Sequence, residues 1–156
     1  MAEGTRPLID DFLAQKRLAF IGVSRDPKDY SRSLFTEFCR RKYITFPVNP
    51  HAAEIDGAVP FAHVQDIPGG VDGALLIVPP NALESVLQDC LHAGVPRLWL
   101  RNNVDKDSPA SRTLAEFSSR GGQVIAGYCP FMFLPETASF HSFHAFILKL
   151  FGGYPR

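Results

Sequence analysis

The sequence is poor in several residue types, and each shortage limits what the protein can do. It contains three cysteines, and its 16 lysines and arginines are balanced by 16 aspartates and glutamates. Because the formal net charge is zero, the sequence lacks the electrostatic attraction that drives nonspecific binding to nucleic acids or anionic membranes. The cysteines are odd in number and lack metal or redox spacing, which gives no sign of a disulfide framework or a metal site.

Long apolar runs are also missing. No run reaches the length of a transmembrane helix, and the N-terminal residues lack the apolar core of a secretory signal. We therefore expect a cytoplasmic protein with no membrane or nucleic-acid partner. Apolar residues in shorter runs are abundant, at 46% of the 156 residues. This amount is enough for a hydrophobic core, and the length predicts a single domain over residues 1–156.

Strand-like and helix-like segments alternate along the chain. Apolar runs predict strands at 18–23, 43–48, 73–78, 97–101 and 123–126, and a very short one at 59–61. Helical spacing predicts helices at 7–15, 30–42, 81–93 and 108–120, and Thr5 is the expected cap of the first. Residues 1–16 thus hold an N-terminal helix, and 138–156 an aromatic helix and tail. This alternation predicts an α/β fold with a doubly wound, mostly parallel sheet of five to six strands and helices on both faces.

In such sheets, ligands bind beyond the carboxyl ends of the strands, where the winding direction reverses. We expect this reversal between strands 18–23 and 73–78. Four loops then meet at one crevice: 22–30, 48–51, 78–81 and 101–103. Most of the unusual residues of the sequence lie in these loops, so the ligand site is predicted there.

The first of these loops has the composition of a phosphate site. It reads Gly22, Val23, Ser24, Arg25, Asp26, Pro27 and Lys28. Glycine permits a tight turn and close backbone approach. Ser24, the amides that follow it and the start of a helix can donate to an anion, and Arg25 and Lys28 add positive charge. The alternative is a plain strand-to-helix turn.

The end of the second strand bears on the choice of nucleotide. A site for NAD usually carries an Asp or Glu there to hold the ribose diol. This chain has Asn49, Pro50 and His51 instead. The neutral or basic end argues against NAD and leaves NADP open.

These segments together resemble a known family. The motifs are Gly22-Val-Ser-Arg-Asp-Pro27, Pro47-Val-Asn-Pro50, Glu54-Ile-Asp-Gly57, Val78-Pro79-Pro80 and Arg97-Leu-Trp-Leu100, with Cys129-Pro-Phe-Met-Phe133 in the tail. In order and spacing they resemble the stand-alone CoA-binding proteins, which have a Rossmann-like fold similar to the nucleotide domain of succinyl-CoA synthetase.

The resemblance implies a path for coenzyme A. It assigns the diphosphate to the 22–27 loop and the adenosine half to residues 48–51. It places the pantetheine near Val78, Pro79, Pro80, Arg101 and Asn102. The chain departs from the family at 101–103, where it has Arg-Asn-Asn and relatives often carry Gln and Gly.

We therefore expect a CoA-binding or acyl-CoA-binding protein that acts as a sensor or carrier without chemistry of its own. One alternative is an NAD(P)-binding redox sensor, with NADP as the alternative cofactor. Another is a thiol enzyme in which Cys129 takes part in acyl or CoA-disulfide exchange, although a small apolar role suits a buried cysteine equally well. Cys39 and Cys90, on predicted helices, are expected to be core or inert.

The tail helix raises two further questions. His141 and His144 share a helical face, but the ligands that a zinc site would also need have no useful spacing. Phe140, Phe143 and Phe146 make the helix apolar on more than one side. Such a helix packs between surfaces, so we expect core packing together with part of a homodimer contact.

Overall fold

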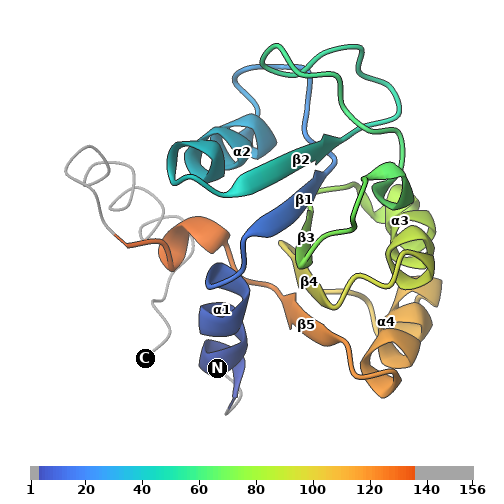
Figure 1. Ribbon diagram of the computed structural model, residues 1–156. Coiled ribbons are helices and arrows are strands. Elements are labelled where there is room, and N and C mark those ends of the chain that lie inside the picture. Colours follow the sequence, from blue (N-terminus) through green and yellow to red (C-terminus); the bar gives the residue numbers. More distant parts are fainter. Residues whose placement is uncertain (1–3, 136–156) are drawn as a thin grey trace.

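The computed structural model of the protein describes residues 4–135 and has one sheet of five parallel strands in the order β2-β1-β3-β4-β5 (Figure 1). The strands are β1 (Arg17–Ile21), β2 (Ile44–Val48), β3 (Gly73–Leu76), β4 (Arg97–Leu100) and β5 (Gln123–Ala126). The α-helices are α1 (Thr5–Leu13), α2 (Tyr30–Arg40), α3 (Pro80–His92) and α4 (Pro109–Ser119). The predicted Rossmann-like α/β fold is confirmed.

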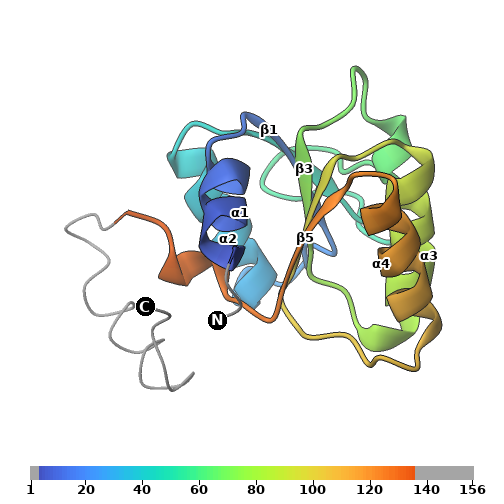
Figure 2. The ribbon, with the colours of Figure 1, turned by 90° about the horizontal axis from the view of Figure 1, so that it is seen from below.

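Helices cover both faces of the sheet, with α1 and α2 on one side and α3 and α4 on the other (Figure 2). The alternation of side chains along each strand produces this arrangement. In β1, Leu18 and Phe20 pack with the cluster under α1 and α2, whereas Ala19 and Ile21 pack with the cluster under α3 and α4. All four are at most 5% exposed.

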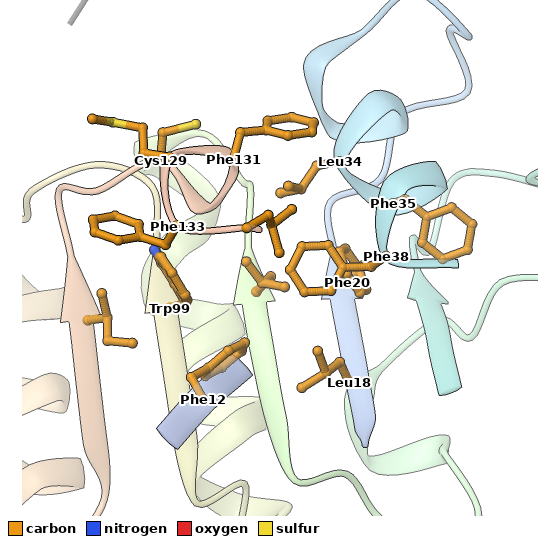
Figure 3. Packing of buried hydrophobic residues seen from close by; sticks show 14 of the residues in the cluster. Phe12, Leu18, Phe20, Leu34, Phe35, Phe38, Trp99, Cys129, Phe131 and Phe133 are labelled. Carbon is orange, nitrogen blue, oxygen red and sulfur yellow. The ribbon is translucent and has the colours of Figure 1, made fainter. Parts of the chain in front are cut away.

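Aromatic side chains dominate the layer beneath α1 and α2 (Figure 3). Phe12 meets Trp99 edge to face, with ring centroids 5.3 Å apart, and Phe20 meets Phe38 at 5.2 Å. Edge-to-face pairs of this kind add to the free energy gained from burial alone. They fix α1 and α2 against β1 and β4, and so fix where the loops beyond these strands begin.

Two strands end two residues earlier than their apolar runs predict. β1 ends at Ile21 because Gly22 has a φ of +95° and leaves the extended region. β3 ends at Leu76 rather than at Val78. The apolar runs in the sequence continue past these strand ends because Val23 is fully buried and Val78 lines a cavity. Burial outside the strands thus explains the overestimated strand lengths.

The short strand predicted at 59–61 is reduced to one bridge. Phe61 forms an isolated parallel bridge with Val48, and its N–H donates to the carbonyl of Pro47 at 2.9 Å. β2 is the edge strand of the sheet. A proline is tolerated there because its missing N–H leaves no inner ladder partner unsatisfied.

Helix ends differ from the expectations in the first two helices, since α1 spans Thr5–Leu13 rather than 7–15 and α2 ends at Arg40 rather than at 42. Thr5 is the first residue of α1, and the residue before it is Gly4 with no side-chain cap, so Thr5 is not the cap. In α2 the cap is Asp29, whose side chain accepts from the Ser31 N–H.

The predicted tail helix at 138–151, with His141 and His144, lies outside the described residues. Within the described part of the chain, no helix is long and apolar enough to cross a membrane.

The basic residues expected at the end of α2 have a specific partner. Arg40 and Arg41 both bind the carboxylate of Glu37, at 2.7 and 2.6 Å. Burial raises the pKa of Glu37, but the hydrogen bonds from Arg40 and Arg41 outweigh it and leave this pKa below its usual value of 4.5. Glu37 therefore stays charged although its side chain is only 4% exposed.

Candidate functional site

The winding of the sheet reverses between β1 and β3, as predicted. A cavity of about 640 Å³ lies at this point, within the range typical of small-molecule sites. A second cavity of about 250 Å³ shares Ile77 and Val78 with the first. The two together form what we call the crevice, which follows the carboxyl ends of β2, β1, β3 and β4.

The crevice brings together most of the residues singled out in the sequence. The main cavity is lined by predicted residues from three loops, namely Gly22, Ser24, Arg25, Asn49, Pro50, His51, Val78 and Pro79. The smaller cavity adds Pro80, Arg101 and Asn102. Val23, Asp26, Pro27 and Lys28 line neither cavity. The remaining lining of the main cavity includes His63, Ser85 and Asp89, which no sequence motif indicates.

Gly22 allows the crevice to exist. A Cβ at this position would lie 2.2 Å from the carbonyl oxygen of Ile77 and 2.9 Å from a methyl group of Val78. The Gly22 N–H also donates to the Val48 carbonyl at 3.0 Å. The backbone segments at the ends of β1, β2 and β3 thus meet at Gly22, which has no side chain. Gly22 and the backbone packed against it line the main cavity.

Asn49 holds two of these loops together. Its side-chain N–H donates to the Val23 carbonyl at 2.9 Å, and its side-chain oxygen accepts from the His51 N–H at 2.8 Å. Asn49 therefore acts first as a brace between the loops after β1 and β2. The sequence predicts Asn49 at the crevice, but it gives no signal for this structural task.

The loop after β1 is hydrogen-bonded mainly to itself. The Ser24 N–H donates to Ser31 Oγ at 2.8 Å, the Asp26 N–H to Ser24 Oγ at 3.1 Å, and the Lys28 N–H to Asp26 Oδ1 at 2.9 Å. The Asp26 and Lys28 amides, which follow Ser24 and which we expect to donate to an anion, are thus bonded to side chains of their own loop in this geometry. The Arg25 guanidinium is exposed and has no ion-pair partner among the described residues.

Arg32 of α2 fixes the same loop from behind. Its guanidinium donates to the carbonyls of Ser24 at 3.3 Å and Arg25 at 3.1 Å, and pairs with Asp56. The Arg32 side chain is only 10% exposed, and its Nε is buried without a hydrogen-bond partner among the described residues. A buried arginine held this way orients the backbone around it.

Cys129 lies beyond β5 in a packed environment (Figure 3). It is 7% exposed, and its sulfur is 3.0 Å from the Tyr30 hydroxyl. Burial raises the pKa of Tyr30 well above its usual range, and Cys129 raises it further. The Arg101 guanidinium lies 4.1 Å from the centroid of the Tyr30 ring. Cys129 lines neither cavity.

The other two cysteines do not line the crevice. Cys90 is fully buried in the core, as expected, and burial raises its pKa to about 12. Cys39 is exposed beside Thr45 rather than in the core. In residues 4–135, no group of three or more His, Cys, Asp or Glu side chains could hold a metal ion.

The doubly wound parallel sheet and the cavity at its reversal define a Rossmann-like α/β protein with a ligand site beyond the strand ends. A family model described as CoA binding domain matches residues 16–135. The chain therefore belongs to the CoA-binding domain family.

One curated relative is the alpha subunit of acetate–CoA ligase (ADP-forming) II from Pyrococcus furiosus. It is 32% identical over 91 residues, which are 56% of this chain and 20% of that subunit. The chain thus spans about a fifth of the length of this relative.

Two solved structures show how the fold is used elsewhere. A dinucleotide-forming acetyl-coenzyme A synthetase from Ca. Korarchaeum cryptofilum is 25% identical, with a TM-score of 0.62 over 75% of this chain and 27% of that one. A conserved hypothetical protein from Pyrococcus furiosus is 24% identical, with a TM-score of 0.63 over 73% of this chain and 95% of that one. The second likeness concerns the fold alone.

Proposed function

We propose that the crevice binds coenzyme A or an acyl-CoA, and that the protein acts as a sensor or carrier of this ligand without reacting with it. The observation that carries the proposal is the main cavity at the β1–β3 reversal in a chain of the CoA-binding domain family. Its volume suits a nucleotide, and two loops supply positive or protonatable groups at Arg25 and His51.

The two connected cavities support a direction for the ligand. The diphosphate lies against Gly22 and Arg25, and the adenosine half lies beside Asn49 and His51 at the end of β2. The pantetheine runs past Val78 toward the smaller cavity, which is lined by Arg101 and Asn102. Since the Asp26 and Lys28 amides are already bonded within the loop, Arg25 carries most of the recognition of the diphosphate.

A binding role without catalysis is supported by the position of the cysteine. A nucleophile must reach the reacting atom, but Cys129 is 7% exposed and packs against Tyr30. The ligase and synthetase activities belong to proteins several times longer than the matched segment. We do not extend these activities to this chain.

Titration calorimetry with CoA, acetyl-CoA, NAD and NADP tests the proposal. We expect saturable binding of CoA and acetyl-CoA, and much weaker binding of NAD and NADP. Arg25→Ala should weaken CoA binding about tenfold, as expected for the loss of one charge-assisted contact. Arg112→Ala, which replaces an exposed arginine on α4, is the matched control and should leave the affinity unchanged. Tighter binding of NADP than of CoA would overturn the proposal.

A further inference from the structure

A histidine and a carboxylate form a pair on the wall of the main cavity, outside the loops that carry the family motifs. His63 precedes the short 3₁₀ helix Val64–Asp66, and Asp89 lies on α3. The His63 Nδ1 is 3.1 Å from Asp89 Oδ2, and both residues line the cavity. A carboxylate can only accept, so Nδ1 carries the proton that it donates to Asp89.

This pairing sets the role of the other ring nitrogen. With the proton on Nδ1, the neutral ring presents Nε2 as an acceptor, and the protonated ring presents it as a donor. The contact with Asp89 uses Nδ1, which leaves Nε2 outside this pair. The ring is about half exposed, so an incoming ligand can reach it.

Two carboxylates hold His63 in place. Asp89 Oδ2 faces its ring, and the Asp66 carboxylate accepts from its backbone N–H at 3.2 Å. Gln65 donates to the second oxygen of Asp89 at 3.1 Å. Both Asp89 oxygens are thus occupied. The other charged or titratable groups on the cavity wall are Arg25 and His51, so the wall presents two further basic side chains beside the His63–Asp89 pair.

We propose that His63, held by Asp89, recognises a phosphate monoester on the adenosine half of the bound nucleotide and takes up a proton as it does so. This inference rests on the proposed function, which places the adenosine half beside Asn49 and His51. The Asn49 N–H donates to the Phe61 carbonyl at 2.9 Å, which brings the segment that holds His63 to the same end of β2. The proton comes from solvent and goes to Nε2, while the proton on Nδ1 stays hydrogen-bonded to Asp89. CoA carries such a phosphate on its ribose and dephospho-CoA does not.

The proton uptake has a direction that follows from linkage. A phosphate dianion beside Nε2 stabilises the charged ring, so the bound complex holds more protons than the free partners do. Affinity for CoA therefore falls as the pH rises from 7 toward 8.5, where the ring must be protonated at increasing cost. Dephospho-CoA, without the phosphate, should show little of this dependence.

Titration calorimetry of the full chain with CoA and dephospho-CoA, in PIPES and in Tris at pH 7.5, tests the proposal. The difference in heat between the buffers gives the number of protons taken up. The wild type should bind CoA about tenfold more tightly than dephospho-CoA, the value of one charge-assisted hydrogen bond. His63→Gln should abolish this preference and the proton uptake, while its affinity for dephospho-CoA stays unchanged.

Two further variants separate recognition from structure. Asp89→Asn keeps an acceptor for Nδ1 but removes the charge, so the preference for CoA and the proton uptake should both shrink. His92→Gln replaces an exposed histidine on the same helix that does not line the cavity, and it should match the wild type. A His63→Gln protein that keeps the wild-type preference and proton uptake overturns the assignment of His63.

The two ways in which the experiment can fail can be told apart. If the wild type binds both ligands with equal affinity, the inference fails while the proposed function stands. If the wild type binds neither ligand, the proposed function fails, and the inference fails with it.

Discussion

At the scale of single residues, Gly22 determines whether the crevice can form. Its φ is +95°, and a Cβ attached to it would lie 2.2 Å from the Ile77 carbonyl oxygen. A positive φ alone is a modest cost for a residue with a side chain. Contact with a backbone oxygen is more severe, because that oxygen belongs to a chain segment that follows a central strand and cannot move alone.

Gly22→Ala should therefore lower the free energy of unfolding by roughly 2–4 kcal/mol and remove CoA binding. Gly94→Ala is the matched control, since Gly94 has a φ of +69° and open space around its Cα. It should cost only about 1 kcal/mol. Urea unfolding of the two variants measures both values. Equal losses would show that the contact with Ile77 is unimportant.

At the scale of elements, α2 does more than cover the sheet. Through Arg32 it holds the carbonyls of Ser24 and Arg25, and through Asp56 it reaches the segment after β2. Asp56 has a φ of +49° and sits in a tight turn closed by mutual hydrogen bonds between Ile55 and Ala58. One buried arginine thus links α2 to two of the segments that border the crevice.

Arg32→Ala should weaken CoA binding and lower the free energy of unfolding by about 1–3 kcal/mol, because the Ser24 and Arg25 carbonyls lose their donor. Arg32→Lys should restore part of the stability but less of the affinity, since an ammonium cannot match the guanidinium geometry. Asp56→Asn should cost under about 1 kcal/mol, because Asp56 is half exposed. Calorimetry and urea unfolding check these values. If Arg32→Ala binds CoA as the wild type does, the linking role is wrong.

The loops of the site can be predicted from the sequence because parallel strands end at the same edge of a sheet. That rule alone brings Gly22, Asn49 and Val78 together. Hydrogen bonding within the loops cannot be predicted in this way, so the sequence does not reveal that the Asp26 and Lys28 amides are bonded to side chains of their own loop. The His63–Asp89 pair joins residues 26 positions apart from different elements. No local pattern signals such a contact.

The ends of the strands are equally hard to predict. The predicted strands extend to Val23 and Val78 because an apolar residue looks the same in the sequence whether it is buried in a strand or in a loop. Val23 is buried beneath a loop and Val78 lines the crevice wall, and neither belongs to a strand. The order of elements follows from periodicity, whereas their ends depend on backbone angles at single residues such as Gly22.

At the scale of the whole molecule, two aromatic and aliphatic cores hold a sheet whose carboxyl edge carries the crevice. The two cores cover opposite faces of the sheet, so its carboxyl edge stays open to a ligand. The family relation extends over residues 16–135, the same part of the chain that forms this edge. The central claim is therefore that CoA binds across the carboxyl ends of β2, β1, β3 and β4.

Hydrogen exchange followed by mass spectrometry, with and without saturating CoA, tests this claim most directly. Slower exchange is predicted in peptides that cover 22–30, 48–51 and 77–82, and no change is predicted in α4, which borders neither cavity. NAD at the same concentration should leave all these peptides unchanged. Protection that is confined to other segments, or that is the same with NAD as with CoA, would contradict the claim.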